Sequence, residues 1–302
     1  MIPAAVRPAL ATLLALASLT GASTALADGP PPAVDPEPQM RLPVAFAARP
    51  ITLPSFVLSP EVGVDWVRQD ASASYADLTV QVAFGITDDL TIRALVAPLQ
   101  LAAPAVDGGF HYGQTAETRG PSAGATYRFV RGAVEAGVGL DVRVFTATDI
   151  TGVAIIPAAS LRGHVGKRVR LDVAASVNIT RATSTEDDDA PTGGVAGPVH
   201  GPSEPANAVR LSVPATALVD IVEPLHLGVS TGLTINNFSD ASNETGIPLG
   251  FFAGYAIAGR HGPILDIDPY LNFPAFIRPA GTSVTDTGDY VVGVNLVGYL
   301  YL

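Results

Sequence analysis

The sequence predicts an all-β fold, a single antiparallel up-and-down barrel of about twelve strands that cross a membrane. From residue 60 to residue 302 the chain repeats stretches of about ten residues in which apolar side chains alternate with polar or small ones. Each stretch ends in a polar turn or loop. A membrane strand needs about nine to eleven residues, whereas strands of soluble sandwiches are typically about five or six residues long. Strand length therefore favours the membrane barrel over an exported soluble β-sandwich, the less favoured alternative.

Residues 1–27 have the pattern of a cleaved secretory signal peptide. Arg7 gives an early positive charge, an apolar run follows at residues 10–19, and Ala25-Leu26-Ala27 is a small-residue cleavage site before Asp28. The apolar run is too short to span a bilayer. We therefore expect export of a mature chain that begins at Asp28.

Residues 28–59 are rich in proline, which predicts an extended periplasmic lead-in with no core of its own. Residues 51–58 are apolar enough to dock against the mouth of a barrel. A plug is therefore the alternative for this segment, and residues 60–302 are the predicted transmembrane barrel.

Composition supports export into an apolar environment. Hydrophobic residues make up 48% of the chain and charged residues 15%, yet no apolar run after residue 27 is long enough for a spanning helix. The chain contains no cysteine, so a closed ladder of backbone hydrogen bonds must hold it together without disulfides. Its formal charge of −11 argues against a nucleic-acid partner.

The connections between predicted strands differ in length at the two ends. Compact turns are predicted at residues 87–89, 130–132, 166–168, 222–224 and 259–262. The longer connections include residues 100–120, 181–207, 238–246 and 274–289. Short periplasmic turns and longer extracellular loops are typical of outer-membrane barrels, which puts both ends of the barrel on the periplasmic side.

The alternation assigns each side chain to a face. Between Val134 and Val144, for example, Val, Ala and Leu face lipid while Glu135, Asp141 and Arg143 face the lumen. A slip of one residue would place these charges in lipid, so the register is strongly specified. The candidate lumen-lining residues are Arg93, Arg128, Glu135, Asp141, Arg143, Arg162, Arg170, Asp172, Arg210, Asp266 and Asp268.

The end of the chain resembles the C-terminal strand signal that the outer-membrane assembly machinery reads. Apolar residues alternate from Val292 to Leu302 beside Tyr299 and Tyr301, although that signal usually ends in Phe. The segment from Phe84 to Leu90 is similar to a hairpin frequent in transporter-type barrels, including the phenol meta-degradation outer-membrane proteins. These two short resemblances imply a bacterial outer-membrane location, with membrane lipid, lipopolysaccharide and the assembly machinery as partners. They leave the oligomeric state open.

The predicted lumen favours a narrow passive channel, or transport-related pore, for small hydrophilic solutes. About twelve strands close into a cylinder roughly 24 Å across, and many inward neighbours are Gly, Ala, Ser or Thr, which leaves room for water. The inward charges have both signs, so they would shape the field of a watery pore or pair in a packed interior. A closed structural or adhesive barrel that acts through its extracellular loops is the alternative.

No catalytic or metal-binding motif stands out. His226 and Ser230 share a strand face, but four residues along a strand separate two side chains by about 13 Å, too far for a nucleophile and its base. We therefore expect no enzymatic activity, no cofactor and no metal site. The acidic run from Glu186 to Asp189 is interpreted as a solvated loop, with a divalent cation bridging lipopolysaccharide phosphates as the alternative.

Overall fold

The structure is a computed structural model, and it describes residues 42–69, 73–102, 110–112, 121–147, 150–182, 207–235, 245–278, 285 and 287–302. A short 3-10 helix, η1 (Phe46–Ala48), precedes the strands. The strands are β1 (Val57–Gln69), β2 (Ala73–Thr87), β3 (Leu90–Ala102), β4 (Phe110–Tyr112), β5 (Ser122–Val130), β6 (Val134–Ala147), β7 (Ile150–Val165), β8 (Val169–Ala182), β9 (Asn207–Val222), β10 (Leu225–Ile235), β11 (Thr245–Gly259), β12 (Gly262–Ile277), β13 (Tyr290–Gly298) and β14 (Leu300–Tyr301).

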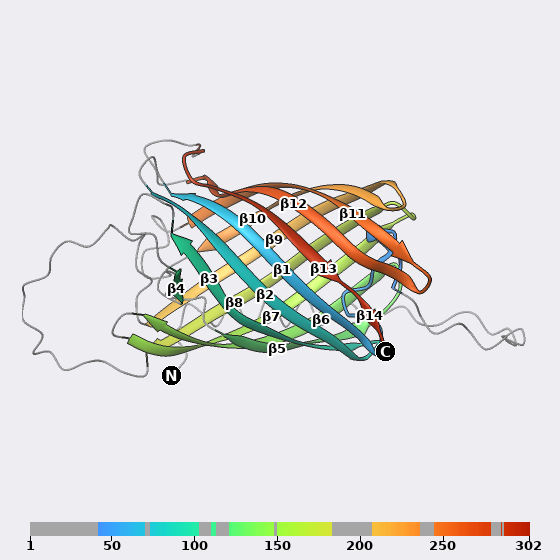
Figure 1. Ribbon diagram of the computed structural model, residues 1–302, viewed down its shortest axis with the longest axis horizontal. Helices are drawn as coiled ribbons and strands as arrows, with labels where there is room; N and C mark the ends of the chain where they lie inside the picture. Colours follow the sequence, from blue (N-terminus) through green and yellow to red (C-terminus); the bar gives the residue numbers. More distant parts are fainter. Residues whose placement is uncertain are drawn as a thin grey trace, which may run out of the picture. The chain divides into compact units, whose positions relative to one another are not determined.

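The long strands form one closed antiparallel barrel of twelve strands (Figure 1). Each pairs with its neighbours in sequence, and β1 pairs with β13 to shut the sheet. Two short strands extend this set: β4 pairs with β3, and β14 continues β13 along β1 after Tyr299. The prediction of an up-and-down barrel of about twelve strands is confirmed.

The connections reproduce the predicted asymmetry. Tight turns join β2 to β3, β5 to β6, β7 to β8, β9 to β10 and β11 to β12, all at one end, which we call the turn end. Gly166 adopts a φ of 67° in the β7–β8 turn, a conformation that glycine enters without steric cost. The Leu302 N–H donates to the Phe56 carbonyl at this end, so the barrel starts and stops there.

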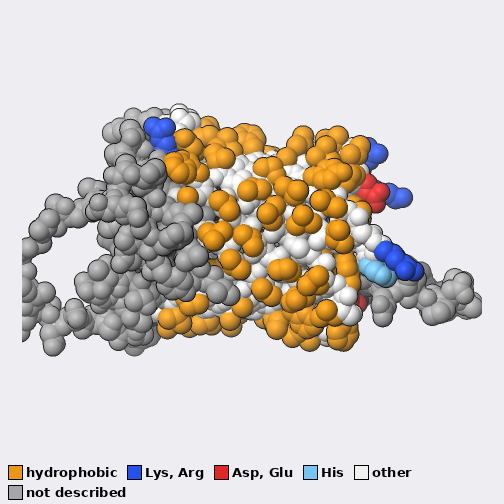
Figure 2. Space-filling view, in the orientation of Figure 1, with side chains coloured by type: hydrophobic (Ala, Val, Ile, Leu, Met, Phe, Trp, Pro, Cys, Tyr) orange, Lys and Arg blue, Asp and Glu red, His pale blue; other side chains and the backbone are white. Residues whose placement is uncertain are grey.

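Apolar side chains cover the outer wall (Figure 2), and the charged side chains of the described residues gather at its ends in this view. On β6, Val134, Val138, Leu140, Val142 and Val144 are all exposed, as their positions in the alternation predict. Glu135, which follows Val134 in the alternation, is buried. The barrel is therefore apolar outside and polar inside, the arrangement that hydrocarbon surroundings require. No helix among the described residues is long and apolar enough to cross a membrane.

This face assignment predicts a depth-dependent cost of charge on β6. Leu140, about midway along the strand, is 49% exposed, and Val134, at the turn end, is 53% exposed. We expect Leu140→Arg to lower the free energy of unfolding in lipid vesicles by about 2–4 kcal/mol and Val134→Arg by about 0–1 kcal/mol. Urea titration of the refolded variants measures both values, and equal costs at the two positions would contradict the assigned membrane depth.

Candidate functional site: the lumen and its inner segment

Residues 42–56, which we call the inner segment, lie inside the turn end of the barrel, immediately before β1 (Figure 1). Leu42, Phe46 and Ala47 are buried. Phe46 and Ala47 pack with Leu218 of β9 and Ala256 of β11, so apolar residues of the wall help to hold the segment. Residues 28–41 of the predicted lead-in, the predicted signal peptide and the run Glu186–Asp189 lie outside the described residues.

The inner segment forms no ladder with a strand over residues 42–55, and side chains of the wall bind its main chain instead. Its N–H groups donate to wall oxygens: Ala47 to Asp220 (2.9 Å), Ile51 to Glu135 (2.8 Å), Leu53 to Thr91 (2.8 Å) and Ser55 to Asp88 (2.9 Å). Its carbonyls accept from wall arginines: Phe46 from Arg170 (2.7 Å), Arg49 from Arg162 (3.0 Å) and Pro50 from Arg162 (2.6 Å). These bonds satisfy backbone groups that would otherwise be buried unpaired.

One buried arginine ties the inner segment to β12. Arg49 makes a bidentate ion pair with Asp266 of β12, with Nη2 to Oδ1 at 3.0 Å, and also donates to the Tyr299 hydroxyl at 3.1 Å. The Tyr299 hydroxyl donates to Asp266 at 2.6 Å. The Arg49 guanidinium lies 3.8 Å from the centre of the Phe46 ring. The side chains of Arg49 and Asp266 are only 8% and 1% exposed, so each charge depends on the other.

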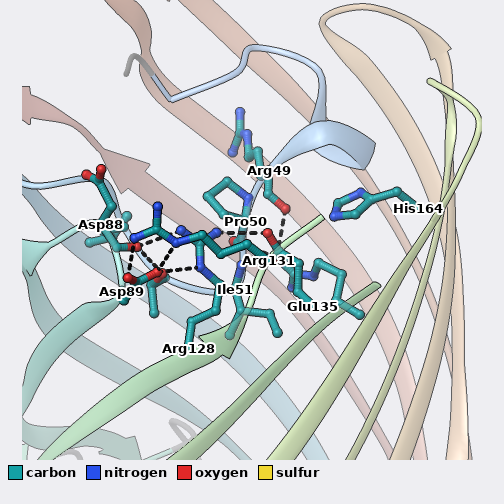
Figure 3. A network of polar contacts seen from close by, with 12 residues as sticks. Arg49, Pro50, Ile51, Asp88, Asp89, Arg128, Arg131, Glu135 and His164 are labelled. Atoms are coloured by element: carbon teal, nitrogen blue, oxygen red, sulfur yellow. Dashed lines mark hydrogen bonds and ion pairs between the residues drawn. The ribbon is translucent and has the colours of Figure 1, made fainter. Parts of the chain in front are cut away.

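A run of charged contacts links the outside of the turn end to the inner segment (Figure 3). Exposed Arg131 pairs with Asp89 in the β2–β3 turn, and Asp89 also accepts from Arg128 at 3.1 Å. Arg128 donates to Glu135 at 2.8 Å, and Glu135 accepts the Ile51 N–H. The Arg131 hydrogen bond, aided by Arg128, holds the pKa of the Asp89 carboxyl below its usual value.

Two further ion pairs join strands of the wall. Arg93 of β3 pairs with Asp141 of β6 and donates to Thr126 of the intervening β5 at 2.8 Å. Arg162 of β7 pairs with Asp172 of the adjacent β8 at 2.7 Å. Each of these pairs joins neighbouring or next-but-one strands, and Arg162 also reaches the inner segment.

All of the predicted lumen residues are buried or half-buried. Ion pairs bring together Arg93 with Asp141, Arg128 with Glu135, and Arg162 and Arg170 with Asp172, while Asp266 holds Arg49. Arg143, Arg210 and Asp268 occupy the same face but belong to none of these pairs.

Sequence reasoning missed Arg49 and Tyr299, and the one local signal for Arg49 is a basic residue in an otherwise apolar, proline-rich stretch. The described residues contain no cluster of His, Asp and Glu able to hold a metal ion.

Comparison with solved structures identifies the same architecture. The chain resembles an outer membrane channel from Pseudomonas putida F1 over 82% of its own length and 97% of that chain, with 12% sequence identity and a TM-score of 0.54. This likeness shows that the two chains share the closed β-barrel fold. The NanC porin is similar over 80% of this chain and 99% of its own, with 8% identity and a TM-score of 0.49. The KdgM porin is similar over 80% of this chain and 98% of its own, with 8% identity and a TM-score of 0.45. No protein-family model and no curated protein matches the sequence.

The Arg49–Asp266 pair predicts that the inner segment is released when Asp266 loses its charge. The chain has no cysteine, so a single Ala47→Cys substitution gives a unique thiol at a buried position. We expect a maleimide to label this thiol at least about tenfold faster in the Asp266→Asn background, because breaking a buried ion pair costs about 3–5 kcal/mol. Asp289→Asn, which breaks a more exposed pair with Arg278, is the matched control and should leave the rate unchanged. Equally slow labelling in all backgrounds would show that the pair does not hold the segment.

The lowered pKa of Asp89 predicts a pH-dependent contribution to stability. The folded-state pKa lies below the unfolded value of about 3.9. The stabilisation is therefore fully present above about pH 4 and is lost as the pH falls through the folded pKa. We expect the difference in unfolding free energy between the natural chain and Asp89→Asn to shrink as the pH is lowered from 7 to 3. A difference that stays constant over this range would rule out the Arg131 and Arg128 pairing as its source.

Proposed function

We propose that the barrel is a passive channel for small hydrophilic solutes and that the inner segment acts as a plug that narrows its turn end. The arrangement of the lumen charges supports this most directly. The Arg93–Asp141 pair joins β3 to β6 past the intervening β5, and both of its side chains are partly exposed.

The exposure of these pairs changes with depth. The side chains of Arg93 and Asp141 are 31% and 18% exposed, whereas Arg128 and Glu135, next to the inner segment, are 4% and 7% exposed. The lumen is thus accessible beside β3 and β6 and occupied at the turn end. A wall of paired charges and small residues offers hydrogen bonds without one dominant sign, which suits small hydrophilic solutes.

The alternative is a closed structural or adhesive barrel that acts through its extracellular loops. One observation favours the closed barrel: many strands hold the inner segment. Hydrogen bonds to this segment come from β3, β6, β7, β8, β9 and β12. A segment held so widely could shut the turn end permanently. The two functions differ in whether ions cross the refolded barrel.

Planar-bilayer recording distinguishes them. We expect a small conductance from a chain that begins at residue 42 and a several-fold larger one from a chain that begins at residue 56, because the second lacks the inner segment. The two chains share every strand, so the first is the matched control for refolding and insertion. If neither chain conducts, the passive-channel function is wrong and the closed barrel replaces it.

A further inference from the structure

We infer that the lumen contains a subsite for a neutral, hydroxylated solute, such as a monosaccharide or polyol, on the wall formed by β7, β8 and β9. This inference rests on the proposed channel function and names the class of solute that the channel would carry. It comes from a cavity at the edge of the inner segment and from the chemistry of its lining.

The cavity has a volume of about 250 Å³. Ile51 of the inner segment contributes one side, and the inward residues Ser160, Arg162, Asp172, Ala174, Pro214 and Thr216 contribute the wall. At roughly 30 Å³ per water molecule, this space holds about eight waters. That is enough room for a small polyol or a single sugar ring, and too little for a long chain.

The charged groups of the cavity already have partners within the protein. The Arg162 guanidinium donates to Asp172 at 2.7 and 3.2 Å and to the carbonyls of Arg49 and Pro50 at 3.0 and 2.6 Å. Arg170 shares the Asp172 carboxylate at 3.0 Å. An anionic solute therefore finds no guanidinium that is free to pair with it, and a cationic solute would have to compete with two arginines for Asp172.

Two hydroxyl groups of the lining are available instead. The side chains of Ser160 and Thr216 make no hydrogen bond within the described part of the chain, and each hydroxyl can both donate and accept. The Asp172 oxygens have further lone pairs for a solute hydroxyl. The charged lining residues, Arg162 and Asp172, carry one charge of each sign, and the cavity presents both donors and acceptors, which matches the hydroxyl groups of a sugar or polyol.

The remaining lining is apolar. Ile51, Ala174 and Pro214 offer aliphatic surface beside the hydroxyls. Gly137 of β6 keeps the approach open, because a Cβ there would lie 3.3 Å from Ser160 Oγ and 3.5 Å from Ile51 Cγ2. A pyranose ring has C–H faces and a rim of hydroxyls, so it can satisfy both kinds of surface at once. An inorganic ion can use only the polar part.

Binding to the refolded full-length barrel in detergent micelles tests the subsite without relying on conduction. We expect saturation-transfer NMR titrations to show weak binding of glucose, and weaker binding of its charged analogues glucuronate and glucosamine. Ser160→Ala and Thr216→Val should each weaken glucose binding by about five- to tenfold, because each removes one hydrogen-bonding group. Ser230→Ala, an inward serine of β10 outside the cavity, is the matched control and should bind glucose as the natural chain does.

The outcomes separate the subsite from the channel. Glucose binding that survives in both cavity variants, or is absent from a barrel that conducts ions, overturns the subsite and leaves the channel standing. Equal binding of glucuronate overturns the charge argument and with it the neutral solute class. Glucose binding with the expected variant pattern in a barrel that conducts nothing supports the subsite and contradicts the channel. Thr216→Val preserves side-chain shape, and a heat-modifiability gel confirms that each variant folds.

Discussion

Every feature of this barrel follows from the need to pair each backbone amide inside the protein, because hydrocarbon offers no hydrogen-bonding partner. The pairing of β1 with β13 meets this need by removing the edges of the sheet. Closure with an even number of strands returns the chain to the end where it began, so Leu302 lies beside Phe56. The inner segment precedes β1 directly and therefore enters the lumen at the turn end. The position of the inner segment at the turn end thus follows from where the barrel begins.

The buried backbone of the inner segment also needs hydrogen-bonding partners. Pro43, Pro50 and Pro54 lack N–H groups and prevent a regular ladder over these residues, yet the remaining N–H and C=O groups still need partners. Carboxylates and arginines of the wall provide them, which explains why charged side chains crowd the turn end. Arg49 brings a charge of its own into this buried region, and Asp266 balances it. The charge pair therefore acts with the backbone contacts, and loss of either partner leaves an unpaired charge in a dry site.

The sequence predicts the barrel well because strand alternation is a local property. The outward positions on β6 and the short turns follow from residues close together in the chain. The structure confirms the turns and five of the six outward positions, while the small side chain of Ala136 is only 2% exposed. The predicted barrel begins at residue 60, whereas β1 begins at Val57, because the strand continues through Pro60. The contact between Arg49 and Asp266 spans 217 positions, and no local pattern says which inward carboxylate an arginine will meet. The inward positions could therefore be predicted, but the choice of partners depends on strand order, stagger and the path of the inner segment.

Long side chains of the inner wall lie over glycines of neighbouring strands. Gly293 of β13 lies between Asp65 of β1 and Tyr270 of β12, and a Cβ at this position would lie only 2.4 Å from the Asp65 carboxylate and 2.6 Å from the Tyr270 ring. The absence of that Cβ lets the Tyr270 hydroxyl donate to Asp65 along the wall. Gly124 likewise leaves space for the Arg93–Asp141 ion pair, since a Cβ at this position would overlap the Asp141 carboxylate. A larger residue at either position would push these side chains toward the barrel axis. Small inward residues thus set the width of the lumen indirectly, by letting large neighbours lie flat.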